Sequence, residues 1–80
     1  MNIRELKPYI LSVLIAYEGK LAIHPSLFID DLIDQLPLDT LVAIGIYLNY
    51  LTPEDMSIVF DRHLAPTLMH PRFNVKVFAR

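Results

Sequence analysis

The sequence predicts an α+β domain that is mostly α, with four helices, a C-terminal β-strand, and a short second strand over residues 20–24 as an open alternative. Three observations predict this fold. Apolar residues recur at helical spacing in four segments, and prolines and glycines separate those segments. Apolar and polar residues then alternate over residues 73–80, which is typical of a strand. Because residues 1–80 contain no repeat and no long linker, we expect one compact helical domain with a C-terminal strand.

The first predicted helix carries apolar side chains at three- and four-residue spacing over residues 6–17. Leu11 and Ile15 add a second apolar stripe, so we expect this helix to be covered on more than one side. Pro8 has no N–H to bond the preceding turn, so the helix either begins just before Pro8 or bends there. Gly19 is the expected stop.

A second helix is expected between two breaks in the chain, with Ser26 as its N-cap and Pro37 directly after its end at Leu36. Its expected buried stripe consists of Phe28, Ile29, Leu32, Ile33 and Leu36. The side chains expected to face water form an acidic face made of Asp30, Asp31 and Asp34.

The third predicted helix, residues 41–51, follows Asp39 or Thr40 as its cap. It is apolar nearly all round, so we expect it to be the central and most deeply buried element. Gly45 lowers helix stability by roughly 1 kcal/mol relative to alanine, which indicates that a neighbouring backbone approaches closely there.

The fourth helix has the clearest local signal. Thr52 is a good N-cap, Pro53 suits the first helical position, and Glu54 and Asp55 oppose the positive end of the helix dipole. We expect this helix to end near Leu64, before Ala65 and Pro66. The expected core of the domain consists of Val13, Leu14, Ile33, Leu36, Val42, Ile46, Leu48, Val59 and Phe60.

A lone C-terminal strand would leave backbone N–H and C=O groups without partners. Within the chain, residues 20–24 are the candidate partner, although that segment is short. The strand otherwise pairs with its copy in a second subunit, or adds to a sheet of another protein.

The chain offers little for catalysis or metal binding. It has no cysteine and no Gly-rich loop, which excludes a thiol nucleophile and the usual phosphate-binding loops. No serine lies beside a histidine, and Asp61, His63 and His70 lack a standard metal-ligand spacing. We expect no enzyme activity, no cofactor, no metal site and no small-molecule substrate.

The expected location is the cytoplasm. The absence of cysteine fits a reducing compartment. The most apolar stretch, residues 41–51, is much shorter than the about 20 residues of a membrane span. No cleavage-site pattern follows the apolar run at residues 9–17, so we expect no signal peptide.

Charge is unevenly placed, although the formal net charge is only −2. Residues 21–61 contain acids and no Lys or Arg, whereas residues 62–80 contain Lys and Arg and no acid. In the interpretation that we favour, the two regions neutralise each other within one fold or across a dimer. In the alternative, the basic C-terminal segment belongs to a small nucleic-acid-binding regulator and contacts phosphates through Arg72, Lys76 and Arg80. Against that alternative, the helix after the tight turn at Thr52 begins with acids, which repel phosphates.

Protein binding is the function that the sequence favours. Apolar residues make up 54% of the chain, and so small a domain has too much surface to bury them all. We expect a non-catalytic interaction module that self-associates as a homodimer. As an accessory protein of the phage or plasmid type, it would act as an adaptor or as an inhibitor that occludes a larger partner. The expected interface residues are Tyr47, Tyr50, Arg72, Phe73, Val75, Lys76, Val77 and Phe78.

Overall fold

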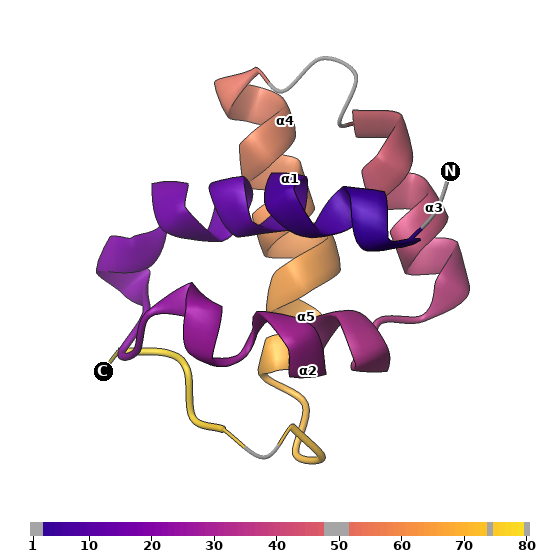
Figure 1. The fold of residues 1–80 in the computed structure, drawn as a ribbon. Coiled ribbons are helices and arrows are strands. Elements are labelled where there is room, and N and C mark those ends of the chain that lie inside the picture. Colours follow the sequence, from indigo (N-terminus) through magenta and orange to yellow (C-terminus); the bar gives the residue numbers. More distant parts are fainter. Residues whose placement is uncertain (1–2, 48–51, 74, 80) are drawn as a thin grey trace.

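The computed structural model describes residues 3–47, 52–73 and 75–79, and the described part is mostly helical (Figure 1). The first half contains the helices α1 (Ile3–Ala16) and α2 (Ile29–Gln35), with the short 3₁₀ turns η1 (Glu18–Lys20) and η2 (Pro25–Leu27) between them. The second half contains α3 (Leu38–Tyr47), α4 (Pro53–Ile58), the π-helical segment η3 (Val59–Leu64) and α5 (Ala65–Leu68). The last three follow one another without a break and form one helical rod, which α1 crosses.

The local signals of the sequence are confirmed best at the start of this rod. The Asp55 backbone N–H donates to Thr52 Oγ1 over 3.1 Å, and the Thr52 N–H donates to Asp55 Oδ2 over 3.3 Å. This reciprocal capping box satisfies two backbone donors that the first turn of a helix would leave without partners. Thr52 is therefore the N-cap that the sequence predicts.

Of the two alternatives at Pro8, a helix start just before it is excluded, because α1 begins at Ile3 and includes Pro8. Two other predicted helix boundaries are wrong. Ser26 does not cap α2, because its own N–H donates to His24 Nδ1 in the preceding 3₁₀ turn and α2 begins only at Ile29. The third helix begins at Leu38 rather than residue 41, with the Leu41 N–H donating to the Pro37 carbonyl.

The expected helix stop at Pro66 is also wrong, because the rod continues to Leu68. A proline inside an α-helix cannot donate to the carbonyl four residues earlier, and its ring collides with that carbonyl. Here the preceding turn is widened, so that the Ala65 N–H donates to the carbonyl of Phe60, five residues earlier. We infer that the wide π-helical turn accommodates Pro66 and lets the helix pass it.

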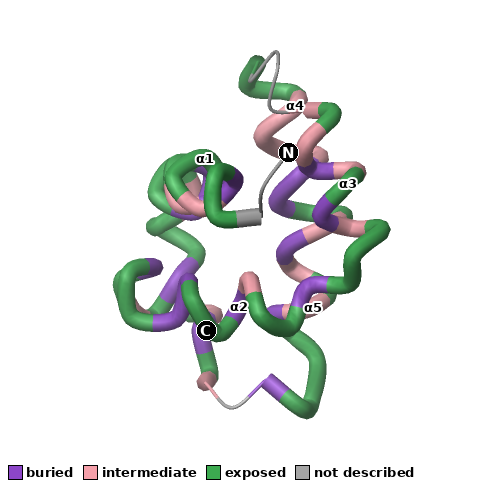
Figure 2. The backbone as a smooth tube through the Cα atoms, turned by 45° about the vertical axis from the view of Figure 1, so that its right-hand side comes forward, coloured by how far each residue is buried: buried purple, intermediate pink, exposed green. Residues whose placement is uncertain are grey.

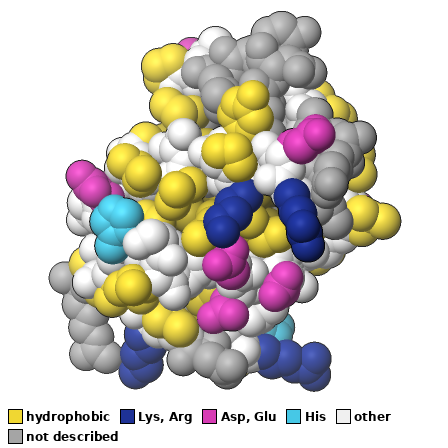
Figure 3. All heavy atoms as spheres, viewed as in Figure 1, with side chains coloured by type: hydrophobic (Ala, Val, Ile, Leu, Met, Phe, Trp, Pro, Cys, Tyr) yellow, Lys and Arg dark blue, Asp and Glu magenta, His cyan; other side chains and the backbone are white. Residues whose placement is uncertain are grey.

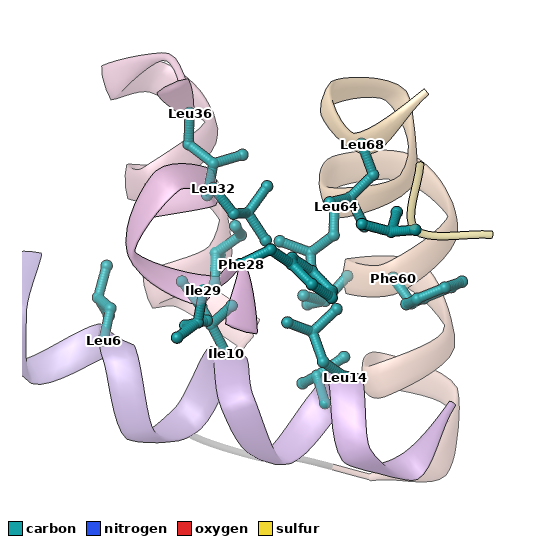
Figure 4. Packing of buried hydrophobic residues seen from close by; sticks show 14 of the residues in the cluster. Leu6, Ile10, Leu14, Phe28, Ile29, Leu32, Leu36, Phe60, Leu64 and Leu68 are labelled. Carbon is teal, nitrogen blue, oxygen red and sulfur yellow. The ribbon is translucent and has the colours of Figure 1, made fainter. Parts of the chain in front are cut away.

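The hydrophobic core lies between α1, α2 and the rod, and the residues that face it are buried (Figures 2 and 4). Figure 4 shows Phe28 at its centre, between side chains of α1 and those of the rod. The predicted core residues that are buried are Val13, Leu14, Leu36, Val59 and Phe60. Ile33 is half-buried and packs against them. The prediction is wrong for Val42 and Ile46, which are exposed, and Leu48 lies outside the described residues.

No strand is present among the described residues, so the helical part of the predicted fold is confirmed and the C-terminal strand is not. Instead, Leu21 and Phe78 form a single antiparallel bridge. The Ala22 N–H donates to the Val77 carbonyl over 2.6 Å, and the Ala79 N–H donates to the Lys20 carbonyl over 3.0 Å. Residues 20–24 are the partner that the sequence predicts, but Lys20 belongs to η1 and only residues 21–24 lie between η1 and η2, so the extended segment is short and a single bridge forms.

Within the described part of the chain, none of the helices has the length and apolar character needed to cross a membrane.

Candidate protein-binding face

The helix α3 carries two apolar stripes whose centres lie about 130° apart around its axis, and only one of them packs inside the protein. Leu41 and Ile44 are buried, with 5% and 0% of their surface exposed. The other side carries Leu38, Val42 and Ile46, which are 70%, 59% and 63% exposed. We call these three residues the α3 face. The predicted all-round apolar character of this helix is therefore present, but its central burial is not.

The spacing of the α3 face makes it one continuous stripe. Residues four apart on an α-helix lie one above the other, displaced by about 40° around the axis. Leu38, Val42 and Ile46 thus line a strip about 12 Å long, estimated from the rise per residue. Asp39 is exposed one residue after Leu38, and the three positions of the strip are all uncharged.

The other exposed large apolar residues among those described do not form a comparable stripe. Leu27 and Met69, each 71% exposed, come from η2 and from the end of α5. Tyr9 and Ile15 are both on α1, but their helical positions differ by about 120° around the axis. Single exposed apolar residues are ordinary on protein surfaces, whereas a contiguous stripe indicates a binding surface.

Tyr47, one of the predicted interface residues, is half-buried. Its ring centroid lies 5.8 Å from that of His63, so it packs against the rod rather than standing clear of the surface. Tyr50, the other predicted aromatic anchor, lies outside the described residues.

The apolar residues of the C-terminal segment pack on the protein's own core. Phe73 is 7% exposed and meets the Phe28 ring edge-on, with centroids 6.3 Å apart. Val77 is 1% exposed, and Val75 and Phe78 are half-buried against the same core. This burial leaves little of Phe73 and Val77 for another chain, while the basic residues Arg72 and Lys76 are exposed. An interface role for the segment stays a prediction.

The acidic face of α2 is exposed as the sequence predicts. Asp30, Asp31 and Asp34 all face solvent, and Lys7 on α1 forms an ion pair with Asp30, with Nζ 2.6 Å from Oδ1. Figure 3 shows acidic side chains beside Lys and Arg side chains on this side of the molecule. An exposed ion pair of this kind contributes at most about 1 kcal/mol. Because Lys7 lies outside the basic segment 62–80, this pair does not test the expected neutralisation between that segment and the acidic residues, which stays a prediction.

Asp61, His63 and His70 do not form a metal-binding group in the part of the chain that the structure describes. Among the residues that the structure describes, no group of three His, Asp or Glu side chains is arranged to hold a metal ion. Asp61 Oδ2 accepts a hydrogen bond from Ser57 Oγ over 3.3 Å, and His63 is half-buried.

The three residues of the α3 face were absent from the predicted interface, although the sequence held a signal for them. Leu38, directly after Pro37, begins a series of apolar residues spaced by four, and Leu41 and Ile44 form a second apolar series on another side of the same helix. When a helix is apolar on two sides and the domain covers only one of them, the other side is left for a partner outside the domain. The sequence does not reveal which side the domain itself covers.

The chain matches no known protein family, and searches of curated proteins and of solved structures find no match.

Proposed function

We propose that this protein is a non-catalytic interaction module that self-associates through the α3 face. The observation that carries the proposal is the exposure of Leu38, Val42 and Ile46 as one stripe of uncharged residues, while Leu41 and Ile44 on another side of the same helix are buried. Covering such a stripe releases ordered water from apolar surface, at about 25 cal/mol per Å². The absence of cysteine from the sequence supports a reducing compartment such as the cytoplasm as its place of action.

A second copy of the chain is the occupant that the stripe fits. In a two-fold dimer the same patch faces itself, so the stripe must be complementary to its own reversed copy. Three residues spaced by four meet this condition in an antiparallel helix pair, in which Val42 faces Val42 and Leu38 faces Ile46. The three residues of the stripe are uncharged, and the exposed Asp39, three residues before Val42, faces Gly45 of the second copy in this pairing rather than a second Asp39.

Gly45 supports the same arrangement. It lies on α3 three residues after Val42, and it is half-buried. Residues three apart are neighbours on a helix surface, so the position beside Val42 lacks a side chain that would hold a second helix away. The close backbone approach that the sequence predicts at Gly45 would in this proposal come from the second copy.

The dimer should be weak. A stable interface buries about 800 Å² on each partner, which is more than three side chains supply. Full burial of an aliphatic side chain contributes about 1.5–3 kcal/mol, while association itself costs at least about 4 kcal/mol. We therefore expect dissociation in the micromolar range or weaker. An adaptor or occluding inhibitor would use the same face for a larger protein, which then displaces the second copy.

Sedimentation equilibrium over a wide range of protein concentrations tests the proposal. The wild-type average mass should rise above the 9.2 kDa of one chain as concentration increases. Val42→Lys should hold the mass at that of one chain, because a charge at the centre of the stripe would be buried without a partner. Leu27→Lys is the matched control, since it places the same charge at an exposed apolar position on another element, and it should associate as the wild type does.

Two results would contradict the proposal. One is a wild-type chain that stays monomeric throughout, and the other is a Val42→Lys variant that associates as strongly as the wild type. The change should not disturb the fold, because Val42 is 59% exposed, and circular dichroism of each variant checks this.

A further inference from the structure

A groove of about 600 Å³ is lined by residues from the end of α2, the start of α3, η3, α5 and the turn after α5. Its lining gathers two arginines and two histidines, Arg62, His63, His70 and Arg72. The hydroxyl-bearing residues Thr40 and Thr67 also line it, and no Asp or Glu does so among the described residues. The charged side chains in this lining are the two arginines, and a groove whose charges are all positive favours anions.

Neither arginine is neutralised within the described part of the protein. The ion pair found there joins Lys7 to Asp30, and none involves Arg62 or Arg72. Both arginines are exposed, so their guanidinium groups keep their N–H donors available. Two such groups on one groove offer the planar, paired donors that recognise an oxyanion.

Buried neighbours in the chain hold the backbone of both arginines in place. Arg62 lies in η3, the π-helical turn, between the buried residues Phe60 and Leu64. π-Helical turns occur frequently at functional sites, because the wider turn redirects its side chains. Arg72 directly precedes the buried Phe73, so its backbone is held against the core at that end.

His70 joins the turn that presents Arg72. The Arg72 backbone N–H donates to His70 Nδ1 over 3.1 Å, and the Phe73 N–H donates to the His70 carbonyl over 2.9 Å. Because Nδ1 accepts this bond, a neutral His70 ring carries its proton on Nε2. The Nε2–H of His70 is therefore a further possible donor from a residue that lines the groove.

We propose that this groove binds the phosphate group of a small ligand, held chiefly by Arg62 and Arg72. The donors present exceed what a carboxylate with two oxygens can use, and they suit a phosphate, which offers a third terminal oxygen. The volume of the groove lies within the range of small-molecule sites. This site is separate from the α3 face and does not depend on self-association.

A small phosphate ligand is favoured over a nucleic-acid strand because the other described cations do not extend the groove into a track. Lys7 pairs with Asp30, and Lys20 lies over the ring of Tyr17 at 5.4 Å. Lys76 lines a different groove, beneath the C-terminal segment. With a net charge of −2, the protein would repel the further phosphates of a strand.

Amide chemical shifts during titration with inorganic phosphate, and separately with phenyl phosphate, test the proposal at constant ionic strength set by chloride. Residues around Arg62, Thr67 and Arg72 should shift and saturate with a dissociation constant of about 1 mM or tighter. The double variant Arg62→Gln/Arg72→Gln should weaken binding about tenfold or more, since it removes charge-assisted hydrogen bonds. Lys76→Gln is the control and should bind as the wild type does.

Saturation by inorganic phosphate alone would identify a free-phosphate site, while tighter binding of phenyl phosphate would identify a monoester site, and both support the proposal. The absence of saturation with either, or unchanged binding by the double variant, would overturn it. A third titration uses a single-stranded oligonucleotide. The small-ligand proposal would be overturned in favour of nucleic acid if that strand bound much more tightly than phosphate and if Lys76→Gln weakened its binding as much as the double variant does.

Discussion

The rings of Tyr17 and Phe60 stack face to face, with centroids 4.5 Å apart and planes 14° from parallel. The contact joins the chain just after α1 to the π-helical segment η3. The Lys20 ammonium lies 5.4 Å over the Tyr17 ring and 5.8 Å over the Phe60 ring, and Phe78 meets Phe60 edge-on at 6.3 Å. Phe60 is thus the residue at which α1, the rod and the C-terminal segment meet.

Replacing Phe60 with alanine should lower the free energy of unfolding by about 3–5 kcal/mol, because it removes a ring that is 2% exposed and leaves a cavity. A domain of this size has a total stability of about 4–12 kcal/mol, so the loss is at least about a quarter of the total. Urea denaturation measures the loss. Tyr9→Ala, at a position that is 46% exposed, is the control, and similar losses in both variants would contradict the central position of Phe60.

Thr52→Ala should lower stability by about 1 kcal/mol, because the Asp55 N–H would lose its acceptor at the start of α4. Thr52→Ser retains the hydroxyl oxygen, and serine is at least as good an N-cap as threonine, so this variant should be as stable as the wild type. Urea midpoints of the two variants measure the difference. An alanine variant as stable as the serine variant would show that the capping box does not stabilise this helix.

Val77→Asp should destabilise the protein by about 3 kcal/mol or more, since it buries a charge without a partner. Val77 is 1% exposed, whereas its near neighbour Ala79 is exposed, so Ala79→Asp provides a control with the same added charge. Thermal unfolding distinguishes the two. If Val77→Asp instead folded normally and only weakened self-association, the C-terminal segment would be an interface rather than part of the core.

Local chemistry explains most of what the sequence predicts correctly. The capping signal at Thr52, the break at Pro37 and the helical spacing in α1 each depend on residues close together in the chain. Pro66 shows where such rules fail. A proline normally ends a helix, but a wider turn before it removes the collision, and nothing in the local sequence reveals that the preceding turn is π-helical.

The sequence does not determine which apolar side of α3 the domain covers. Leu41 and Val42 are adjacent and both apolar, yet one is 5% and the other 59% exposed. The spacing of four predicts that Leu38, Val42 and Ile46 share a side of α3, but which side is covered depends on how α3 meets the rod. The sequence does not predict the groove either. Arg62 and Arg72 come from different elements, and only the turn after α5 places both beside the same groove.

A single cysteine at Val42 tests the antiparallel α3 pairing most directly, because the wild-type chain has no cysteine that would interfere. Packed helix axes lie about 8–10 Å apart and Cα atoms lie about 2.3 Å from each axis, so facing Cα atoms come within reach of a disulfide. Under mild oxidation Val42→Cys should form a covalent dimer rapidly, and an excess of wild-type chain should slow its formation. Leu27→Cys, equally accessible but off the stripe, should remain monomeric under the same conditions. If Val42→Cys stays monomeric, or if both variants cross-link at the same rate, self-association through the α3 face is contradicted.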